Sequence, residues 1–486
     1  MDSNIYVKNV RLKFPGEKSL LFKDLSCSFE KGEKVLILGP SGCGKSTLLQ
    51  VLSGLIPHSV EVPMKAEGIK VPQSWGYVFQ DPDTQFCMPY VDEEIAFVLE
   101  NLQIPREQMN GRIKQHLEQV GLQLEDIHMN IQTLSGGMKQ RLAIASVLAL
   151  EPEVLFLDEP TAMLDPKGTK EIWEIFKKVG SDKTIIVVEH KIDHVLEFID
   201  RIILFNEIGQ IIADGRKEDI LSQYKENFKS QGIWYPGVWE EYTEGVHKGN
   251  LQIIQDTEPL LQLSNFTGYR KKQKKIYVEN IRIYPGEWIV IKGENGAGKS
   301  TLLHSLMQFI KTSGVYKLNG KIIKNGKKIS DLMTFVFQNP EFQFVTNSVF
   351  EEIAFSLRLG NKREQEIQMK VQYFLHMFHL LNHQDKHPFQ LSMGQKRRLS
   401  VAASIVRGQR LLLLDEPTFG QDSKNTFALL ELLEEFRQNL STILMVTHDE
   451  NIEKYFATRV WTISNGEILS DQKVTMDYKK SESISI

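Results

Sequence analysis

Residues 39–47 read GPSGCGKST and residues 293–301 read GENGAGKST, so the pattern G-x-x-x-x-G-K-[ST] occurs twice. Each copy follows an apolar run, KVLIL or WIVI, and precedes an apolar helical pattern. A glycine loop between a strand and a helix N-terminus binds phosphate through its backbone N–H groups. A glycine-rich turn without a nucleotide is disfavoured, because the full motif recurs in the same context. The predicted phosphate-binding residues are Gly39, Pro40, Ser41, Gly42, Cys43, Gly44, Lys45, Ser46, Thr47, Gly293, Glu294, Asn295, Gly296, Ala297, Gly298, Lys299, Ser300 and Thr301.

Four further pairs of motifs follow the two loops in the same order and at nearly constant spacing. They are Gln80 and Gln338, LSGGMKQR (134–141) and LSMGQKRR (391–398), VLFLDEPT (154–161) and LLLLDEPT (411–418), and His190 and His448. The chain of 486 residues therefore contains an internal repeat, with one copy in each half. We predict a first domain at 1–224, a linker at 225–258 whose two tryptophans pack onto a domain, and a second domain at 259–486.

Apolar runs such as TIIVV (184–188) and TILMV (442–446) are typical of strands that are buried on both faces. Helical patterns lie between these runs. The alternation predicts an α/β fold with a mainly parallel sheet in each half.

Composition excludes several classes of protein. The 58 Lys and Arg nearly balance the 62 Asp and Glu, giving a formal charge of −4, so no global field attracts nucleic acid or anionic lipid. No apolar run approaches the roughly 20 residues of a membrane-spanning helix. The three cysteines cannot form a disulfide framework, and the N-terminus lacks the pattern of a signal peptide. A reducing cytosol is the expected environment.

The two runs that end in Asp-Glu suggest hydrolysis at the phosphate loops. Asp158 and Asp415 would lie beside a Mg²⁺ ion that Ser46 and Ser300 also ligate, and Glu159 and Glu416 would face an attacking water molecule. The alternative is an acidic strand end that only caps the next helix.

The LSGGMKQR and LSMGQKRR segments resemble the signature sequence of ATP-binding-cassette (ABC) ATPases, and the similarity covers nearly the whole chain outside the linker. The resemblance implies two P-loop NTPase domains in tandem, each with an antiparallel β subdomain and a helical signature subdomain, and ATP and Mg²⁺ as cofactors. It also implies that Ser135 with Gly137, and Ser392 with Gly394, touch the γ-phosphate held by the opposite domain. Met393 departs from the glycine that the family has at this position.

The same resemblance assigns roles to the remaining motifs. His190 and His448 resemble the switch histidine at the γ-phosphate, and Gln80 and Gln338 would contact Mg²⁺ and the attacking water. Asp165 and Asp422 lie in segments that resemble the loop by which the family couples its two nucleotide sites. Phe14 and Tyr269 lie where the family stacks an aromatic ring on adenine, although either could instead belong to a strand core.

The turn after each glutamine suggests what the protein drives. Asp81 to Gln85 form a D-x-x-x-Q motif, and the second half has Asn339 in place of the aspartate in the matching segment that ends at Gln343. This motif looks like that of the ATPases of energy-coupling-factor importers, which take up vitamins and metal ions. The fused layout resembles thiamine or hydroxymethylpyrimidine importers. The resemblance implies an integral membrane coupling subunit, a substrate-binding membrane subunit and a peripheral location on the cytoplasmic face of the cell membrane.

Some interpretations remain open at this point. The acidic segments 91–97 and 350–355 could receive a basic helix of the partner or could be solvated faces. A soluble tandem ABC protein acting on ribosomes or DNA is the alternative function, although the mixed-charge linker does not favour it. We also expect Cys43, beside Lys45 at a helix N-terminus, to be more reactive than a typical buried cysteine.

Overall fold

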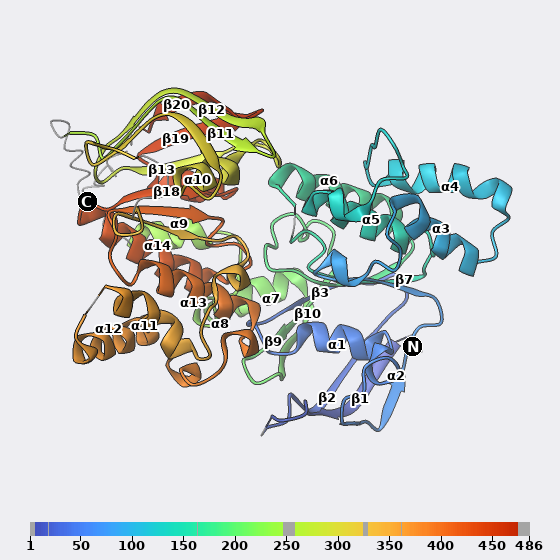
Figure 1. The fold of residues 1–486 in the computed structure, drawn as a ribbon. Helices are drawn as coiled ribbons and strands as arrows, with labels where there is room; N and C mark the ends of the chain where they lie inside the picture. Colours follow the sequence, from blue (N-terminus) through green and yellow to red (C-terminus); the bar gives the residue numbers. More distant parts are fainter. Residues whose placement is uncertain are drawn as a thin grey trace, which may run out of the picture. The chain divides into compact units, whose positions relative to one another are not determined.

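The computed structural model describes residues 5–474 except 18, 163, 246–257, 324–328 and 361. The chain forms two compact units, which are drawn in Figure 1. The first comprises Met1–Val238 and Gly420–Lys424, and the second comprises Trp239–Phe419 and Asn425–Ile486. The division falls within the segment predicted to be the linker, of which residues 246–257 lie outside the described part of the chain.

The first unit contains a four-stranded antiparallel sheet, in which β1 pairs with β2, β4 and β5, and a six-stranded sheet in the order β10-β9-β3-β8-β7-β6. Its strands are β1 Ile5–Leu12, β2 Phe22–Phe29, β3 Lys34–Leu38, β4 Met64–Lys65, β5 Gly68–Lys70, β6 Trp75–Val78, β7 Val154–Asp158, β8 Thr184–Val188, β9 Arg201–Phe205 and β10 Ile211–Arg216. Its helices are α1 Lys45–Leu52, α2 Leu55–His58, η1 Pro82–Thr84, α3 Val91–Asn101, α4 Arg106–Gln119, η2 Ile131–Thr133, α5 Gly136–Leu148, α6 Pro166–Val179, α7 Lys217–Gln223 and α8 Lys225–Gln231.

The second unit repeats this plan with one ten-stranded sheet in the order β15-β14-β11-β12-β20-β19-β13-β18-β17-β16. Its strands are β11 Leu261–Arg270, β12 Gln273–Ile283, β13 Trp288–Lys292, β14 Lys311–Leu318, β15 Lys321–Ile322, β16 Met333–Val336, β17 Leu411–Asp415, β18 Thr442–Val446, β19 Arg459–Ser464 and β20 Glu467–Lys473. Its helices are α9 Val238–Gly245, which starts at the last residue of the first unit, α10 Lys299–Leu306, η3 Pro340–Gln343, α11 Val349–Leu359, α12 Glu364–Met377, η4 Leu381–His383, η5 Pro388–Gln390, α13 Met393–Ile405, α14 Ser423–Gln438 and α15 Glu450–Phe456.

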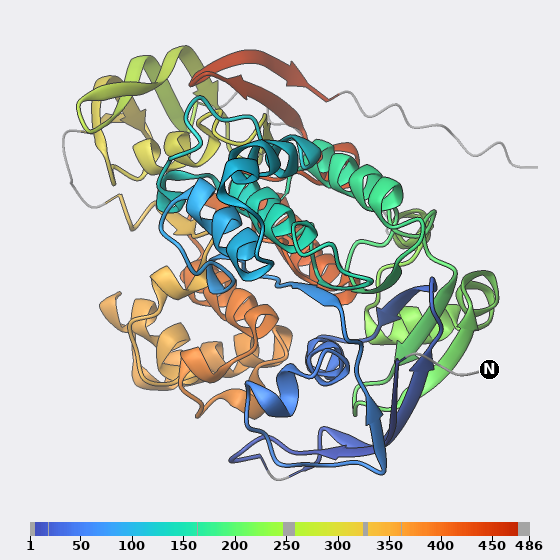
Figure 2. The same cartoon turned by 90° about the vertical axis from the view of Figure 1, so that its right-hand side faces the viewer.

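The predicted α/β class is confirmed in both units. Strands β3, β8 and β7 pair in parallel, and β7 and β8 are buried along their whole length because helices cover both faces of such a sheet. Figures 1 and 2 show α3, α4 and α5, in light blue to teal, grouped away from the dark blue strands β1 and β2. The antiparallel β part and the helical part are therefore distinct, as the resemblance implies.

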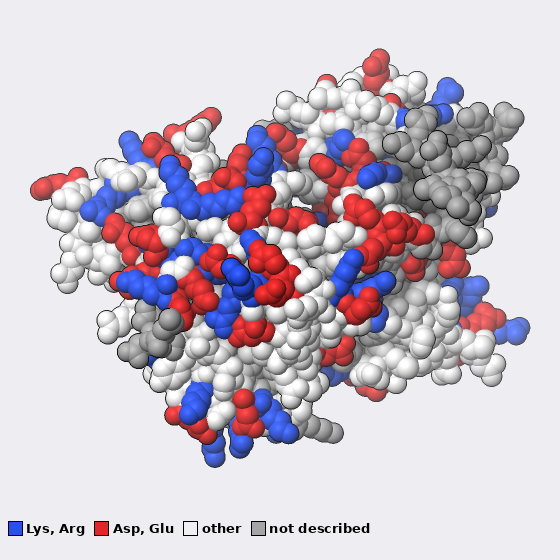
Figure 3. Space-filling view, turned by 180° about the vertical axis from the view of Figure 1, so that it is seen from behind, with Lys and Arg blue, Asp and Glu red and all other residues white. Residues whose placement is uncertain are grey.

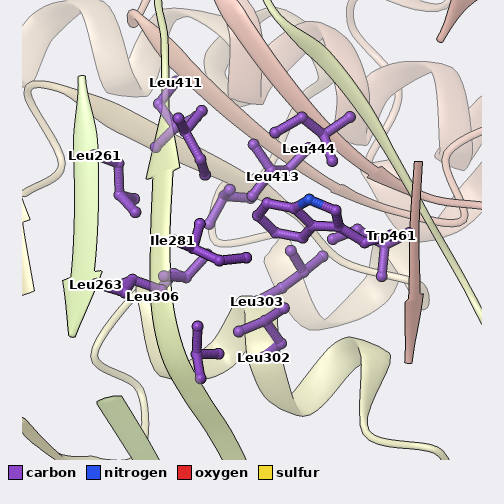
Figure 4. Packing of buried hydrophobic residues seen from close by; sticks show 14 of the residues in the cluster. Leu261, Leu263, Ile281, Leu302, Leu303, Leu306, Leu411, Leu413, Leu444 and Trp461 are labelled. Atoms are coloured by element: carbon purple, nitrogen blue, oxygen red, sulfur yellow. The ribbon is translucent and has the colours of Figure 1, made fainter. Parts of the chain in front are cut away.

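The core of the second unit fixes the helix that follows its phosphate loop. Figure 4 shows leucines of α10 packed against Leu413 of β17, Leu444 of β18 and the indole of Trp461 on β19. Leu303, Leu413, Leu444 and Trp461 are fully buried. Burial of side chains of this size contributes roughly 1.5–3 kcal/mol each, so α10 is held firmly on the sheet.

The linker residues in the described part of the chain are not loosely attached. Trp234 and Trp239 are only 8% and 7% exposed, which confirms that the two tryptophans pack into the fold. In a separate observation, none of the helices among the described residues has the length and apolar character needed to cross a membrane.

Candidate functional site

The first phosphate loop lies between the end of β3 and the start of α1. Lys45 is 7% exposed and donates hydrogen bonds to the carbonyl oxygens of Gly39 at 2.7 Å and Pro40 at 2.9 Å. Gly44 precedes α1 with φ 103°, and an added Cβ would lie 2.7 Å from the Phe22 ring. Only glycine fits such a left-handed, crowded position, so the loop's last glycine is dictated by backbone geometry.

The second loop has the same geometry in its own unit. Lys299 donates to the carbonyl oxygens of Gly293 at 2.7 Å and Glu294 at 3.1 Å. Gly298 precedes α10 with φ 108°. Both loops therefore present backbone N–H groups and a lysine at the start of a helix, which is the arrangement that binds nucleotide phosphates.

Asp158 at the end of β7 lies against the first phosphate loop. The Ser46 hydroxyl donates to Asp158 Oδ1 at 2.8 Å, and the Tyr77 hydroxyl donates to Asp158 Oδ2 at 3.1 Å. Burial raises the pKa of Asp158 to about 6, although the hydrogen bond from Ser46 opposes the shift. A carboxylate held this way is stabilised by any positive charge that approaches the loop.

The second unit offers a similar oxygen site. Burial raises the pKa of Asp415, and the hydrogen bond from Ser300 opposes that rise. Asp415 Oδ1 is buried without a hydrogen-bond partner among the described residues, so it retains the capacity to ligate a cation. Carboxylate and hydroxyl oxygens beside a phosphate loop are ligands that Mg²⁺ prefers, so both residue sets fit this ion.

The predicted base Glu159 is engaged through both carboxylate oxygens. Gln80 Nε2 donates to Glu159 Oε2 at 2.7 Å, and His190 Nε2 lies 3.0 Å from Glu159 Oε1. Burial would raise the pKa of Glu159, but the charge and hydrogen bond of His190 hold it below its usual range. Burial would likewise lower the pKa of His190, and Glu159 raises it. Glu159 is therefore an ionised carboxylate with a protonatable neighbour.

In the second unit the corresponding histidine also faces the predicted base, at a longer distance. His448 Nε2 is 3.4 Å from Glu416 Oε1. Gln338 follows β16 and is exposed. The structure thus brings together most of the predicted catalytic residues within each unit.

Two groups in the first site escaped the sequence analysis because the two halves differ there. Tyr77, which holds Asp158, has Phe335 as its counterpart. Glu189 has Thr447 as its counterpart; its carboxylate accepts from the Thr161 hydroxyl at 2.9 Å and from the His190 N–H at 3.0 Å. The only available signal was the mismatch between otherwise matching segments, which identifies a difference but not a contact.

The signature serines begin their helices. Ser135 Oγ accepts from Met138 N at 3.3 Å, and Ser392 Oγ accepts from Gln395 N at 3.4 Å. Met393 is 57% exposed, so the start of α13 accommodates its side chain without displacing the capping serine. The contacts of Ser135, Gly137, Ser392 and Gly394 with a nucleotide stay a prediction.

The second glutamine of each turn has a structural partner. Gln85 Nε2 donates to the Ala143 carbonyl at 2.8 Å, and Gln343 Nε2 donates to the Ser400 carbonyl at 2.8 Å. Both acceptors belong to the signature helices α5 and α13. The turn is therefore fastened to the signature helix of its own unit.

Asp81 and Asn339 have the same internal role. Asp81 Oδ1 accepts from Asp83 N at 3.0 Å and Asn339 Oδ1 accepts from Glu341 N at 2.9 Å, so each caps its turn. The substitution of Asn for Asp keeps this hydrogen bond.

The two aromatic candidates for adenine differ in setting. Phe14 follows β1 and is 36% exposed. Tyr269 lies on β11 and lines a shallow pocket, and its hydroxyl lies 3.1 Å from Ser313 Oγ. The other residues of this pocket are Arg270, Lys271, Gln273, Lys275, Ile310 and Lys311. Stacking on adenine stays a prediction for both rings.

The surroundings of Cys43 act on its thiol in opposite directions, and its reactivity relative to other buried cysteines stays a prediction. Cys43 is only 1% exposed, and burial raises the pKa of its thiol more than the nearby Lys45 charge lowers it. The motif placed a cation nearby but could not reveal burial, which favours the neutral thiol.

Comparison with known proteins identifies what this arrangement resembles. The sequence profile of a family described as "ABC transporter" matches residues 22–162 and 279–419. The chain is 35% identical to the "Putative HMP/thiamine import ATP-binding protein YkoD" of Bacillus subtilis strain 168, covering 97% of this chain and 91% of that protein. It is 34% identical to a "Putative ABC transporter ATP-binding protein" of Methanosarcina mazei, covering 97% and 89%.

Solved structures also resemble the chain, and one of them matches most of its length. It is the archaeal ribosome recycling factor aABCE1 in complex with the ribosomal stalk protein aP1, with a TM-score of 0.62 and 20% identity. The match covers 91% of this chain and 86% of that chain. At this identity the likeness shows the fold alone.

The thiols give a direct test of the burial of Cys43. Cys87 is exposed, whereas Cys27 and Cys43 are buried, so brief treatment with a maleimide should label Cys87 at least about tenfold faster than Cys43. Peptide mass spectrometry measures the labelled fractions, and Cys87→Ser serves as the control that removes the fast site. Labelling of Cys43 ahead of Cys87 would contradict the structure.

Glu189 predicts a pH dependence of stability. Burial raises its pKa from 4.5 to about 7, so its contribution to stability is complete below pH 4.5 and is lost as the pH rises through 7. Glu189→Gln removes this loss while keeping a hydrogen-bonding amide. The variant should therefore gain on the order of 1–3 kcal/mol relative to wild type between pH 5 and pH 8.

Thermal unfolding of both proteins across this pH range measures the effect. Glu207→Gln, at an exposed position in the same unit, is the matched control and should follow the wild-type profile. Parallel profiles for Glu189→Gln and wild type would show that Glu189 does not titrate in this range.

Proposed function

Because this chain belongs to the ABC transporter family, we propose that it powers import of a vitamin, a vitamin precursor or a metal ion through separate membrane subunits. The chain is an ATP-hydrolysing enzyme whose activity is coupled to transport. Thiamine or its hydroxymethylpyrimidine precursor is the substrate that we favour, because a relative covering nearly the whole chain is named for import of these compounds.

The observation that carries the catalytic proposal is the cluster behind the first phosphate loop. Glu159 contacts Gln80 and His190, and the adjacent Asp158 contacts Ser46. A base, a histidine and an oxygen site for a cation thus lie together beside a phosphate-binding loop. This is the arrangement that hydrolysis of a nucleoside triphosphate requires.

We assign Glu159 and Glu416 as the general bases of the two sites. His190 keeps the pKa of Glu159 low, so its carboxylate is ionised at neutral pH and can accept a proton from water. Lys45 and Lys299 neutralise phosphate charge from within their loops, and His190 and His448 orient the base. Ser46 and Asp158, and likewise Ser300 and Asp415, would hold Mg²⁺ with Gln80 and Gln338 nearby, and the ion when bound would supply charge stabilisation to the phosphates.

The turn after Gln338 is the surface that we assign to a membrane partner. Exposed apolar side chains occur on this turn and on α11 and η5 of the second unit, namely Phe342, Val345, Phe355, Leu359 and Phe389. Their counterparts in the first unit are Thr84, Cys87, Phe97, Asn101 and Gln132. Clustered exposed apolar residues mark protein interaction sites, so partner binding would rest more on apolar contact in the second unit.

Among the described residues, the face drawn in Figure 3 has no concentration of basic residues. On the face drawn in Figure 3, Lys and Arg are interspersed with Asp and Glu. A nucleic-acid footprint would concentrate basic residues on one face. The localisation test below can also detect the alternative, a soluble tandem ABC protein that acts on ribosomes or DNA.

The assignment of the bases predicts the effect of neutral substitutions. Glu159→Gln or Glu416→Gln should retain ATP binding but lower turnover at the altered site by at least about 10²-fold, since one preorganised catalytic group is lost. The double variant should be inactive. Steady-state ATPase assays with parallel binding of a fluorescent ATP analogue measure both quantities, and unchanged hydrolysis in the double variant would refute the assignment.

Localisation tests the importer proposal. The protein should sediment with membranes only when an integral partner encoded nearby is co-expressed, and the assembled complex should take up labelled thiamine or hydroxymethylpyrimidine. Phe342→Asp should abolish sedimentation and retain ATPase activity, because Phe342 is 76% exposed. Leu469→Asp, at a 68% exposed position on β20, is the matched control. Sedimentation with ribosomes instead would favour the alternative.

A further inference from the structure

The segment Gly232–Trp234, which we call the linker turn, is hydrogen-bonded to the loop before α14. Trp234 Nε1 donates to the Gln421 carbonyl at 2.9 Å, and the Ser423 N–H donates to the Gly232 carbonyl at 2.9 Å. All of these residues lie within the first unit. Trp234, Gln421 and Ser423 are 8%, 5% and 3% exposed, so both hydrogen bonds are shielded from water.

The linker turn is held in place by its own helix. Gly232 ends α8 in the left-handed conformation with φ 71°, and Ile233 N donates to the Phe228 carbonyl at 2.9 Å. Phe228 is fully buried and stacks on Tyr235, with their ring centroids 6.2 Å apart. The carbonyl and the indole that contact the loop are therefore presented by a fixed support.

Close approach of the two segments favours glycine at position 232. A Cβ added there would lie 3.0 Å from Asp422 Oδ1 and 3.0 Å from the Lys424 Cβ. Contacts this short would require the side chain of Asp422 or Lys424 to move by a few tenths of an ångström. The left-handed φ of 71° independently favours glycine at position 232.

The linker turn also completes a helix start. The first N–H groups of an α-helix lack partners within the helix, and Ser423 is the first residue of α14. Its N–H is satisfied by Gly232.

We propose that the linker turn is a positioning element for the loop 419–422 and, through it, for Glu416. Phe419 N donates to the Glu416 carbonyl at 3.2 Å, and the chain runs directly from there into the residues that Trp234 and Gly232 hold. Trp234 acts through this loop and is a positioning residue, not a catalytic one. The inference rests on the proposed role of Glu416 as a base.

Two linker tryptophans provide a matched pair of variants. Trp234→Phe removes the N–H donor to Gln421 and keeps an aromatic ring. Trp239→Phe changes the ring that stacks on Tyr455 and packs edge-on against Phe427. In the full chain, Trp234→Phe should lower kcat at least about threefold with KM for ATP within about twofold, whereas Trp239→Phe should leave both near wild type.

Amide hydrogen exchange tests the contact independently of catalysis. Trp234→Phe should speed exchange in the peptide covering residues 420–425 by about tenfold and leave the peptide covering 164–170 unchanged. Unchanged exchange at 420–425, or equal losses of kcat in the two tryptophan variants, would overturn the inference. If wild type itself fails to hydrolyse ATP, the proposed function fails, while the exchange measurement still decides whether the linker turn holds the loop.

Discussion

The hydrogen bond from Ser46 to Asp158 joins the phosphate loop to the acid-bearing strand, and the geometry of the first site depends on it. It can form because β3, β8 and β7 are parallel neighbours, so the carboxyl ends of all three strands meet at one edge of the sheet. His190 reaches Glu159 for the same reason, since it follows β8. The order of the buried strands thus determines which side chains can act together.

A second constraint extends from this edge into the helical part of each unit. The glutamines Gln85 and Gln343 donate to backbone carbonyls of α5 and α13, and Lys139 of α5 lies 2.6 Å from Asp83 in the turn. A turn that is tied to the signature helix in this way moves with it as one body. A protein that pressed on the turn would therefore displace the start of the signature helix in the same unit, and no long chain of side chains is needed to transmit the force.

The fold and most of the site were predictable from sequence because their signals are local. Glycine loops, strands ending in Asp-Glu and the histidine after an apolar run each depend on residues that are close in the chain. The role of Tyr77 was not predictable, because it depends on β6 being the neighbour of β7. The burial of Cys43 was not predictable for a related reason, since the motif shows the charge beside the thiol but not the surrounding core. The linker region forms the helices α8 and α9, but its sequence has no clean periodicity from which they could be predicted.

The pairs Tyr77 and Phe335, and Glu189 and Thr447, are differences that one chain with two copies of the domain can keep and an assembly of identical subunits cannot. In a symmetric assembly of identical subunits, one gene specifies both sites, so every substitution appears twice and any benefit at one site is tied to its effect at the other. Joining the two copies in a single polypeptide separates their inheritance. Each half can then accumulate its own changes around a shared set of reactive groups.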